Sequence, residues 1–369
     1  MLFLLRCFFI GCSILALGAC TGNALSPHPP TRALPDASLR ANGATSIATP
    51  STTRFWSAYC VGCGIAMGSG GGNIEVDVIG ATSGALFHTF TFGFSYEPFI
   101  VTSPDQRHVY VAISRFAGNA IADIDTQTYA VRYYTIPILI ANGAVVGLAI
   151  SPDGTRLYVP TTSSVVGATR KLYVVNTISR TFAAVLPIDV ELPAVSPDGH
   201  TLFGRSFIGN TIALTATDTA TFHMRTVAPD PGSLNLAASS TKLYVSTIQS
   251  ATSSHLNIYD TSTLALVKQI FLSGEPYGGM VMDAPRSRVF ISLNTTNTEY
   301  VVVNTIEDRV IGTWAGVAGP PLVDPLTHIV YGHYAGNACE FAPPSYFRNC
   351  PLAGGYGANG DPMSVTTSD

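Results

Sequence analysis

The segment Ala149-Ile150-Ser151-Pro152-Asp153-Gly154-Thr155-Arg156-Leu157-Tyr158-Val159 decides the fold of this chain. It consists of an apolar stretch, a Ser-Pro-Asp-Gly turn and a second apolar stretch centred on an aromatic residue. Proline, aspartate and glycine at these positions are typical of a tight β-turn. Short apolar runs on both sides of such a turn predict two antiparallel strands.

The same pattern recurs along the chain. Ser-Pro-Asp turns also begin at Ser103 and Ser196, and in every copy an aromatic residue follows seven positions after the turn begins. The six aromatic residues are Tyr110, Tyr158, Phe203, Tyr244, Phe290 and Tyr331. They lie 48, 45, 41, 46 and 41 residues apart, as expected for repeated units with variable loops. A period in the forties with four short strands per unit predicts a β-propeller, and the aromatic residues are expected in its core.

A second landmark in each unit is an Asp-Thr or Asn-Thr pair at the end of the third strand. An Asp or Asn side chain in such a turn accepts a hydrogen bond from the backbone two residues further on. We therefore interpret these residues as structural. The pairs begin at Asp125, Asn176, Asp218, Asp260 and Asn304. For Asp123 with Asp125, the alternative is a metal-binding or acid–base pair.

The two ends of the chain complement each other. Residues 53–92 contain a second, a third and a fourth strand but no first strand, whereas residues 361–369 match the first strand at 97–105 position by position. The C-terminal strand is therefore expected to complete the first unit, which divides residues 54–369 into seven units of about 45 residues. The predicted fold is an all-β, seven-bladed β-propeller whose ring is closed by the C-terminal strand.

The repeat resembles the YVTN-type β-propeller repeat, in which a first strand ending in Ser-Pro-Asp-Gly leads to Tyr-Val-Thr-Asn. Tyr158-Val159-Pro160-Thr161, Tyr244-Val245-Ser246-Thr247 and Tyr110-Val111-Ala112 carry this resemblance. It extends over nearly all of residues 54–369 and implies a propeller fold and a periplasmic or cell-surface location. It implies no activity, because the family shares blade geometry rather than an active site.

Residues 1–20 are interpreted as an export signal. Arg6 supplies the positive charge, and the apolar run at 7–19 is shorter than the roughly 20 residues that a membrane-spanning helix needs. Leu17-Gly18-Ala19-Cys20 resembles the lipobox of bacterial lipoproteins, which implies that Cys20 is lipidated and becomes the new N-terminus. The alternative is an ordinary signal peptide that contains a cysteine.

In lipoproteins, Thr21 rather than Asp after the cysteine implies the outer membrane of a Gram-negative cell. We therefore expect a lipid-anchored protein on the periplasmic side of the outer membrane or at the cell surface. Residues 21–53 are rich in Pro, Ser, Thr and Ala and are interpreted as a flexible tether. The net charge is −4 without any basic run, so nucleic acid is not expected as a partner.

Four cysteines follow the signal segment, and an even number in an oxidising compartment predicts two disulfides. We expect one bridge between Cys339 and Cys350, because a hairpin centred between residues 344 and 345 places them opposite each other. Cys60 and Cys63 would then pair locally or remain reduced. Bridges from Cys339 to either of them are the alternative.

The Cys60-Val61-Gly62-Cys63 sequence could instead be a redox or metal motif. Gly64 stands where attachment of c-type haem requires His, and no histidine lies at ligand spacing beside either cysteine pair. Neither a His-x-His group nor a nucleophile elbow occurs in the chain. We therefore expect no metal, no cofactor and no catalytic residues.

Two classes of function remain. The first is a membrane-tethered, non-catalytic binding or scaffold module for a protein or small-molecule partner. The second is a lactonase- or lyase-like propeller enzyme whose site lies at the central channel. Thr, Ser, Ala and Gly fill most of the loops, which favours the binding module and makes an enzyme the less expected alternative.

The loops between units and the loops between second and third strands are expected to form the ligand-binding face. They lie at the same end because successive strands alternate in direction, and they include the variable loops 61–73, 161–171, 247–255 and 353–361. Arg115, Arg205 and His333 occupy related positions just after second strands and are candidates for this face. Solvated rim side chains are the alternative interpretation.

Overall fold

The computed structural model describes residues 52–61, 72–81, 85–95, 98–113, 119–136, 144–162, 170–208, 211–229, 232–250, 252–295, 298–334, 337–342, 347–352 and 363–368. All of them belong to one compact unit, Thr49–Asp369. They form β-strands and one 3-10 turn, η1 (Ala284–Arg286). In this part of the chain, no helix is long and apolar enough to cross a membrane.

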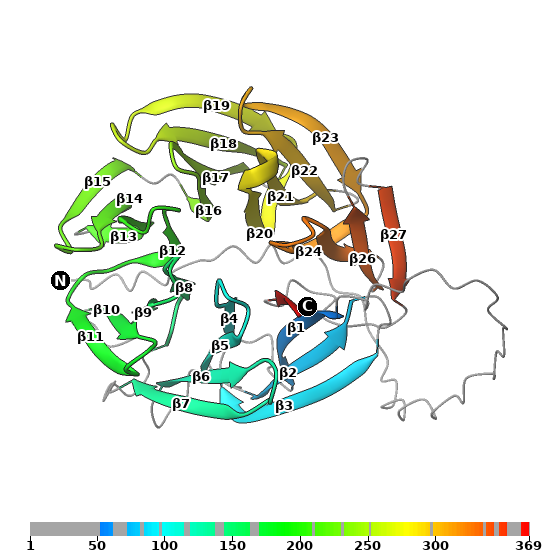
Figure 1. Cartoon of the computed structure of the whole chain (residues 1–369). Coiled ribbons are helices and arrows are strands. Elements are labelled where there is room, and N and C mark those ends of the chain that lie inside the picture. Colours follow the sequence, from blue (N-terminus) through cyan, green and yellow to red (C-terminus); the bar gives the residue numbers. More distant parts are fainter. Residues whose placement is uncertain are drawn as a thin grey trace, which may run out of the picture. The chain divides into compact units, whose positions relative to one another are not determined.

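The described residues form seven antiparallel sheets of four strands each (Figure 1). Sheet 1 pairs β28 (Met363–Ser368), β1 (Thr52–Val61), β2 (Gly72–Gly80) and β3 (Leu86–Ser95) in this order. Sheet 2 contains β4 (Phe99–Thr102), β5 (His108–Ile113), β6 (Asn119–Asp125) and β7 (Val131–Ile136). Sheet 3 contains β8 (Ala149–Ile150), β9 (Arg156–Thr161), β10 (Lys171–Asn176) and β11 (Thr181–Leu186).

The other four sheets have the same meander order. Sheet 4 contains β12 (Glu191–Val195), β13 (Thr201–Ile208), β14 (Thr211–Asp218) and β15 (Met224–Pro229). Sheet 5 contains β16 (Ser233–Ala238), β17 (Lys242–Ser250), β18 (Ser253–Asp260) and β19 (Leu266–Leu272). Sheet 6 contains β20 (Glu275–Asp283), β21 (Arg288–Asn294), β22 (Glu299–Asn304) and β23 (Arg309–Ala315). Sheet 7 contains β24 (Val317–Val323), β25 (Val330–Tyr334), β26 (Asn337–Ala342) and β27 (Phe347–Leu352).

The sheets are arranged around their first strands. Each first strand contacts the first strands of the sheets before and after it, in the series β28, β4, β8, β12, β16, β20, β24 and again β28. Figure 1 shows fourth strands such as β7, β11, β19 and β23 on the outside of this arrangement. The prediction of an all-β fold made of four-stranded units is therefore confirmed.

The first strand of sheet 1 comes from the C-terminal end of the described chain. β28 pairs antiparallel with β1, with Met363 opposite Ser57 and Ser368 opposite Thr52. Figure 1 shows the C-terminus beside β1. This is the pairing that the match between residues 361–369 and 97–105 predicts.

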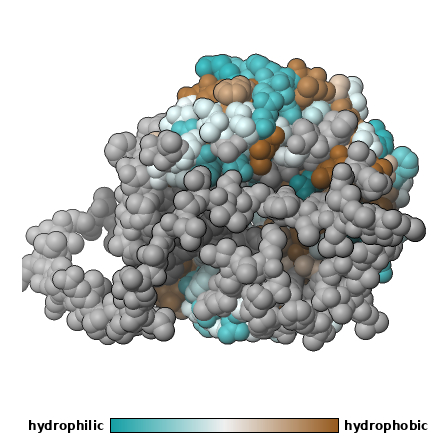
Figure 2. Space-filling model, turned by 180° about the vertical axis from the view of Figure 1, so that it is seen from behind, coloured by the Kyte–Doolittle hydropathy of each residue, from teal (hydrophilic) through white to brown (hydrophobic). Residues whose placement is uncertain are grey.

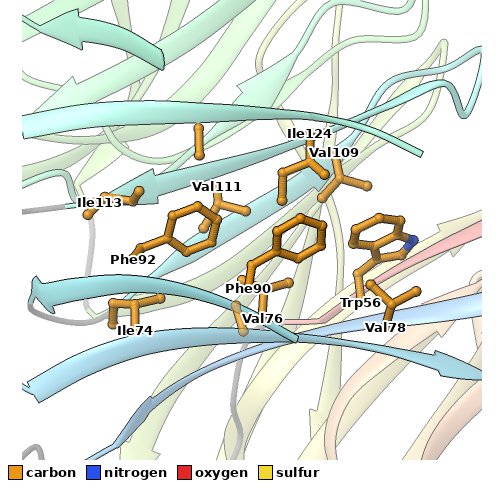
Figure 3. Close-up of a cluster of buried hydrophobic side chains, with 12 residues drawn as sticks. Trp56, Ile74, Val76, Val78, Phe90, Phe92, Val109, Val111, Ile113 and Ile124 are labelled. Carbon is orange, nitrogen blue, oxygen red and sulfur yellow. The ribbon is translucent and has the colours of Figure 1, made fainter. Parts of the chain in front are cut away.

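Apolar side chains fill the spaces between neighbouring sheets. Trp56 and Phe90 of sheet 1 pack against Val109 and Val111 of sheet 2 (Figure 3). The other clusters of buried residues also join neighbouring sheets, and one of them includes Phe55 of sheet 1 together with residues of sheet 7. Because the middle strands are covered on both faces, they read as continuous apolar runs rather than alternating ones.

The repeat aromatics belong to this core, as the sequence predicts. Tyr110, Tyr158, Phe203, Tyr244, Phe290 and Tyr331 are all buried. The outer strands are covered less completely, and Leu266, Val267 and Phe271 on β19 are exposed. Figure 2 shows hydrophobic and hydrophilic patches side by side on the face turned away from the view in Figure 1.

The Ser-Pro-Asp turns are held by a small hydrogen-bond network. Ser103 Oγ donates to Asp105 Oδ1 at 2.5 Å and accepts from the His108 amide at 2.9 Å. The Arg107 amide donates to the same carboxylate oxygen at 3.1 Å. The turns that begin at Ser151 and Ser196 repeat these three contacts.

The Asx-Thr turns are equally regular, which confirms their structural interpretation. Asp260 Oδ1 accepts hydrogen bonds from the amides of Ser262 at 3.0 Å and Thr263 at 2.8 Å. The same two backbone contacts occur at Asp125, Asn176, Asp218 and Asn304. The threonine that follows ties the two turns of one sheet together. Thr219 Oγ1, for example, donates to the Gly199 carbonyl at 2.6 Å.

Asp260 provides a test of these turns. Hydrogen bonds from the Ser262 hydroxyl and from Thr263 lower the pKa of Asp260 to about 2. Because this lies below the unfolded value of about 3.9, the carboxylate stabilises the fold above that value, and the contribution is lost as the pH falls towards 2. We expect Asp260→Ala to lower the melting temperature at pH 7.

Asp260→Asn is the matched control, because Asn176 and Asn304 hold the same turn position in other sheets. We expect it to keep the melting temperature of the parent at pH 7 and to flatten the acid dependence. Thermal melts between pH 2 and pH 7 measure both effects. An alanine variant that melts like its parent at pH 7 would show that the turn bond contributes nothing.

Removal of residues 360–369 tests the role of β28. The deletion leaves the backbone of β1 without a partner on one side and uncovers part of the surface around Phe55. Exposing one large apolar side chain costs about 1.5–3 kcal/mol, against a typical net stability of about 5–15 kcal/mol. An unpaired strand edge also promotes aggregation. We expect insolubility or a strongly lowered melting temperature.

The control is a deletion of residues 21–50, which leaves every described strand in place. Both variants should be compared with the chain from residue 21 by thermal melting. A C-terminal truncation that melts like its parent would contradict the structural role of β28.

Candidate functional site

The strand connections lie at two opposite ends of the sheets. The Ser-Pro-Asp turns and the Asx-Thr turns lie at one end, here called the turn face. The connections between second and third strands and those between sheets lie at the other end, here called the loop face, because successive strands are antiparallel. The isolated bridge between Val145 and Thr161 agrees with this assignment, since it joins the segment that enters sheet 3 to the end of β9.

The structure describes only one side chain among the three predicted ligand-face residues. Arg115 lies outside the described residues, and His333 is described only through its backbone in β25. Arg205 lies on β13. Whether the three residues share one rim therefore stays a prediction.

The predicted lipidation and disulfide residues are described in part. Cys20 and Cys63 lie outside the described residues, and Cys60, Cys339 and Cys350 are described through their backbone in β1, β26 and β27. Glu340 lies opposite Asn349, which is the register expected for a hairpin centred between residues 344 and 345. The register shifts next to this pair, towards Ala338. The disulfides remain predictions.

One predicted loop is wrong. The segment from Thr247 to His255 is mostly a continuation of β17 and β18, with Thr247 opposite His255 and Ser250 opposite Ser253. The hydroxyl groups of Ser250 and Ser253 lie 2.7 Å apart across this hairpin. The polar Ser and Thr residues, which the sequence analysis interpreted as loop residues, are thus strand residues.

Arg205 belongs to a group of charged side chains at the loop face of sheets 3 and 4. The group consists of Arg170, Asp189, Glu191 and Arg205 and is called the loop-face charge cluster. Arg205 Nε and Nη2 lie 3.2 and 2.9 Å from Glu191 Oε2. Arg170 Nη1 contacts the other carboxylate oxygen of Glu191 and lies 3.4 Å from Asp189 Oδ1. Two sheets therefore contribute to one cluster.

Phe207 lies beside both guanidinium groups of the cluster. The Cζ atoms of Arg170 and Arg205 lie 4.1 and 5.9 Å from the centroid of its ring, within the range of cation–π contacts. The Phe207 amide donates to Asp189 Oδ2 at 2.9 Å. The arrangement holds both arginine side chains against the protein surface.

The charge cluster is only partly exposed to solvent. The side chains of Asp189 and Glu191 are 14% and 13% exposed, and those of Arg170 and Arg205 are 26% and 22% exposed. Burial raises the pKa of Asp189, whereas the Phe207 amide and Arg170 act in the opposite direction. The two cations and two carboxylates balance, so the cluster carries no net charge.

A second polar site lies at the turn face, where a cavity of about 350 Å³ opens between sheets 2 and 3. His108 and Tyr110 of sheet 2 and Thr177 and Arg180 of sheet 3 line it. Behind the cavity wall, His108 Nδ1 lies 2.7 Å from Asp123 Oδ1. The Tyr134 hydroxyl donates to Asp123 Oδ2 at 3.0 Å.

This geometry separates the two aspartates that the sequence analysis considered as a pair. Asp125 completes its turn, whereas Asp123 is buried and interacts with His108 and Tyr134. In the described part of the chain, no three His, Cys, Asp or Glu residues form a group that could hold a metal ion. The two carboxylates therefore have different hydrogen-bond partners.

His108 and Asp123 have the composition of an acid–base pair, and Ser103 and Thr177 line the same cavity. Among the described side chains, no hydroxyl or thiol is hydrogen-bonded to the other ring nitrogen of His108. Burial, followed by the charge of Asp123, raises the pKa values of Tyr110 and Tyr134. Both phenols are therefore protonated at neutral pH.

His108 and Arg170 are site residues that the sequence pattern does not predict. A single histidine in a strand is usually a packing residue, and Arg170 contacts a strand that begins 21 residues later. The repeat did contain one signal for His108. It lies two residues before the repeat aromatic Tyr110, and the equivalent positions before Tyr158 and Tyr244 hold the cations Arg156 and Lys242.

Comparison with known proteins yields structural neighbours only. No protein-family model and no curated protein matches the sequence. A protein of unknown function from Desulfotomaculum acetoxidans has a TM-score of 0.59 at 15% identity, covering 80% of this chain and 96% of its own. A putative 6-phosphogluconolactonase from Bacteroides fragilis has a TM-score of 0.54 at 10% identity, covering 88% and 100%.

A third neighbour is the dihydro-heme d1 dehydrogenase NirN, with a TM-score of 0.54 at 16% identity over 81% of this chain and 63% of its own. These neighbours have propeller-like folds. At such low identity the similarity shows the fold alone. The chain therefore has a β-propeller-like all-β fold.

Proposed function

We propose that the protein is an exported, lipid-anchored β-propeller of seven blades that acts as a non-catalytic binding or scaffold module. Its partner is a protein or a small molecule bound at the loop face. The YVTN-type repeat and the lipobox-like sequence before Cys20 support the family assignment and the export route.

The contacts between sheets 7 and 1 support closure of the seven sheets into a ring. β24 contacts β28, and β28 pairs with β1. The rings of Phe55 in sheet 1 and Tyr331 in sheet 7 meet edge to face with 4.4 Å between their centroids. Each sheet then lies between two neighbours, which is the arrangement that stabilises a propeller.

The loop-face charge cluster is the observation that carries the binding proposal. Partly buried ion pairs contribute little net stability, because desolvation offsets their attraction. Arginine and aromatic side chains are enriched among residues that dominate binding energy at protein interfaces. Arg170 and Arg205 beside Phe207 provide such a group on a face whose loops are otherwise poor in charge.

The alternative is a lactonase- or lyase-like propeller enzyme with its site at the central channel. Such enzymes often hold a divalent metal between acidic or histidine residues of several blades. Elemental analysis of the purified protein separates the two proposals. A stoichiometric divalent metal would favour the enzyme.

Substitution of Cys20 tests the membrane anchor. We expect the parent protein to incorporate labelled fatty acid and to fractionate with the outer membrane when it is expressed in a Gram-negative cell. Cys20→Ala should abolish the fatty-acid label, and the protein should no longer fractionate with the outer membrane. Cys12→Ala, in the same signal segment, is the control and should behave like the parent. A labelled Cys20→Ala protein would refute lipidation at this residue.

A photo-crosslinking amino acid tests the loop face as the binding surface. Ile208 is exposed at the end of β13 next to Phe207, whereas Ser262 is exposed on the turn face. We expect a crosslinker at Ile208, but not at Ser262, to form a discrete adduct in cells. Arg205→Ala should reduce that adduct at least about tenfold, which corresponds to about 1.4 kcal/mol. Adducts confined to Ser262 would contradict the assignment.

A further inference from the structure

A repeated contact links neighbouring sheets at the turn face. A cationic side chain on the second strand of one sheet donates to the threonine carbonyl in the Asx-Thr turn of the next sheet. Lys242 Nζ reaches the Thr305 carbonyl at 2.8 Å. Arg156 Nη1 reaches the Thr219 carbonyl at 2.9 Å. At these two junctions, sheet 5 with 6 and sheet 3 with 4, the space between the turns holds a cation.

The junction between sheets 1 and 2 has the same contact. Arg54 Nη1 donates to the Thr126 carbonyl at 3.2 Å and to the Tyr129 hydroxyl at 2.8 Å. At the junction of sheets 5 and 6, Lys242 also contacts Asp308 Oδ2 at 2.7 Å. The second acceptor of the cation thus differs between these two junctions: it is a phenol for Arg54 and a carboxylate for Lys242. The threonine carbonyl is the acceptor that all three junctions share.

The junction between sheets 2 and 3 lacks such a side chain. His108 stands two residues before Tyr110, at the position of Arg156 and Lys242, but its ring is shorter and turns towards Asp123. The cavity of about 350 Å³ lies at this junction, and Thr177 of the next Asx-Thr turn lines it. Within the described part of the chain, no side chain donates to the Thr177 carbonyl.

The charges around the cavity favour a cation. Asp105 and Asp153 line it. Burial acts to raise the pKa of Asp105, but the hydrogen bonds of the turns outweigh it and lower the pKa values of both aspartates, so both are ionised at neutral pH. Asp123 adds a third carboxylate behind His108. Arg180 is the opposing charge in the cavity lining, where it interacts with the Tyr134 hydroxyl. Outside the lining, Arg107 and Arg156 lie close enough to attract Asp105 and Asp153, but among the described residues they form no ion pair with them.

We propose that this cavity binds a small alkylammonium ion, whose charged head donates to the Thr177 carbonyl as Lys242 does to Thr305 in its own junction. The volume is at the lower end of the range of about 300–1,000 Å³ for ligand pockets, so the cavity has ample room for a ligand of the size of one lysine side chain. The site lies on the turn face and is independent of partner binding at the loop face.

The probe is n-butylammonium chloride, which reproduces the end of a lysine side chain. Thermal melts of the full chain from residue 21 are recorded with increasing probe against equal concentrations of sodium chloride. A ligand that binds only the folded state raises the melting temperature. We expect such a rise with n-butylammonium and none with n-butanol or sodium butyrate, which have the same carbon chain without the positive charge.

Two substitutions locate the site. His108→Lys places an ammonium group in the cavity from within the chain, so the probe-dependent rise should disappear. Arg180→Ala removes the opposing charge, so the dissociation constant measured by calorimetry should fall at least about threefold. Arg225→Ala, an exposed arginine on β15 of sheet 4, is the matched control and should leave the response unchanged.

Lys242→Ala extends the test to a junction that is filled in the parent protein. It should lower the basal melting temperature and create a second response to n-butylammonium. This outcome does not depend on the stability of the His108→Lys variant. A rise with butyrate, a loss of the response in Arg180→Ala or an unchanged response in folded His108→Lys would each overturn the proposal.

Discussion

The structure depends on burying both faces of its four-stranded sheets at once. The middle strands carry apolar side chains on both sides, and each buried cluster joins two neighbouring sheets, as Trp56 and Val109 do for sheets 1 and 2. No sheet can bury its residues alone, so every sheet needs a neighbour on each side. The contacts between turns of neighbouring sheets, such as that of Lys242 with Thr305, form only when the sheets are packed in this way.

The strands and turns of this fold could be predicted because their signals are local. A Ser-Pro-Asp turn satisfies its hydrogen bonds within six residues, and an Asx-Thr turn does so within four. The repeat aromatics follow at a constant distance and are buried in every copy. The match between residues 361–369 and 97–105 also identified the partner of β1, because both segments have the pattern of a first strand.

The candidate sites could not be predicted in the same way, because they depend on contacts between sheets. Arg170 precedes β10 of sheet 3 and Glu191 begins β12 of sheet 4, so the contact between them depends on how these two sheets pack together. The pairing of His108 with Asp123 lies within one sheet, but it depends on which way the histidine ring turns. The hairpin at Thr247 and His255 was misinterpreted because Ser and Thr are common in both strands and loops.

The pairing of β28 with β1 has a consequence for the order of folding. Thr52 and Ser368 lie opposite each other, so the contact closes a chain segment of more than 300 residues. Closing such a segment costs more entropy than forming any neighbouring hairpin, and contacts between distant residues form slowly. Sheets 2 to 7 each consist of strands that follow one another in the chain, so they can form before β28 pairs with β1. Sheet 1 is therefore expected to be the last sheet completed, and until then the unpaired edge of β1 most needs protection from other chains.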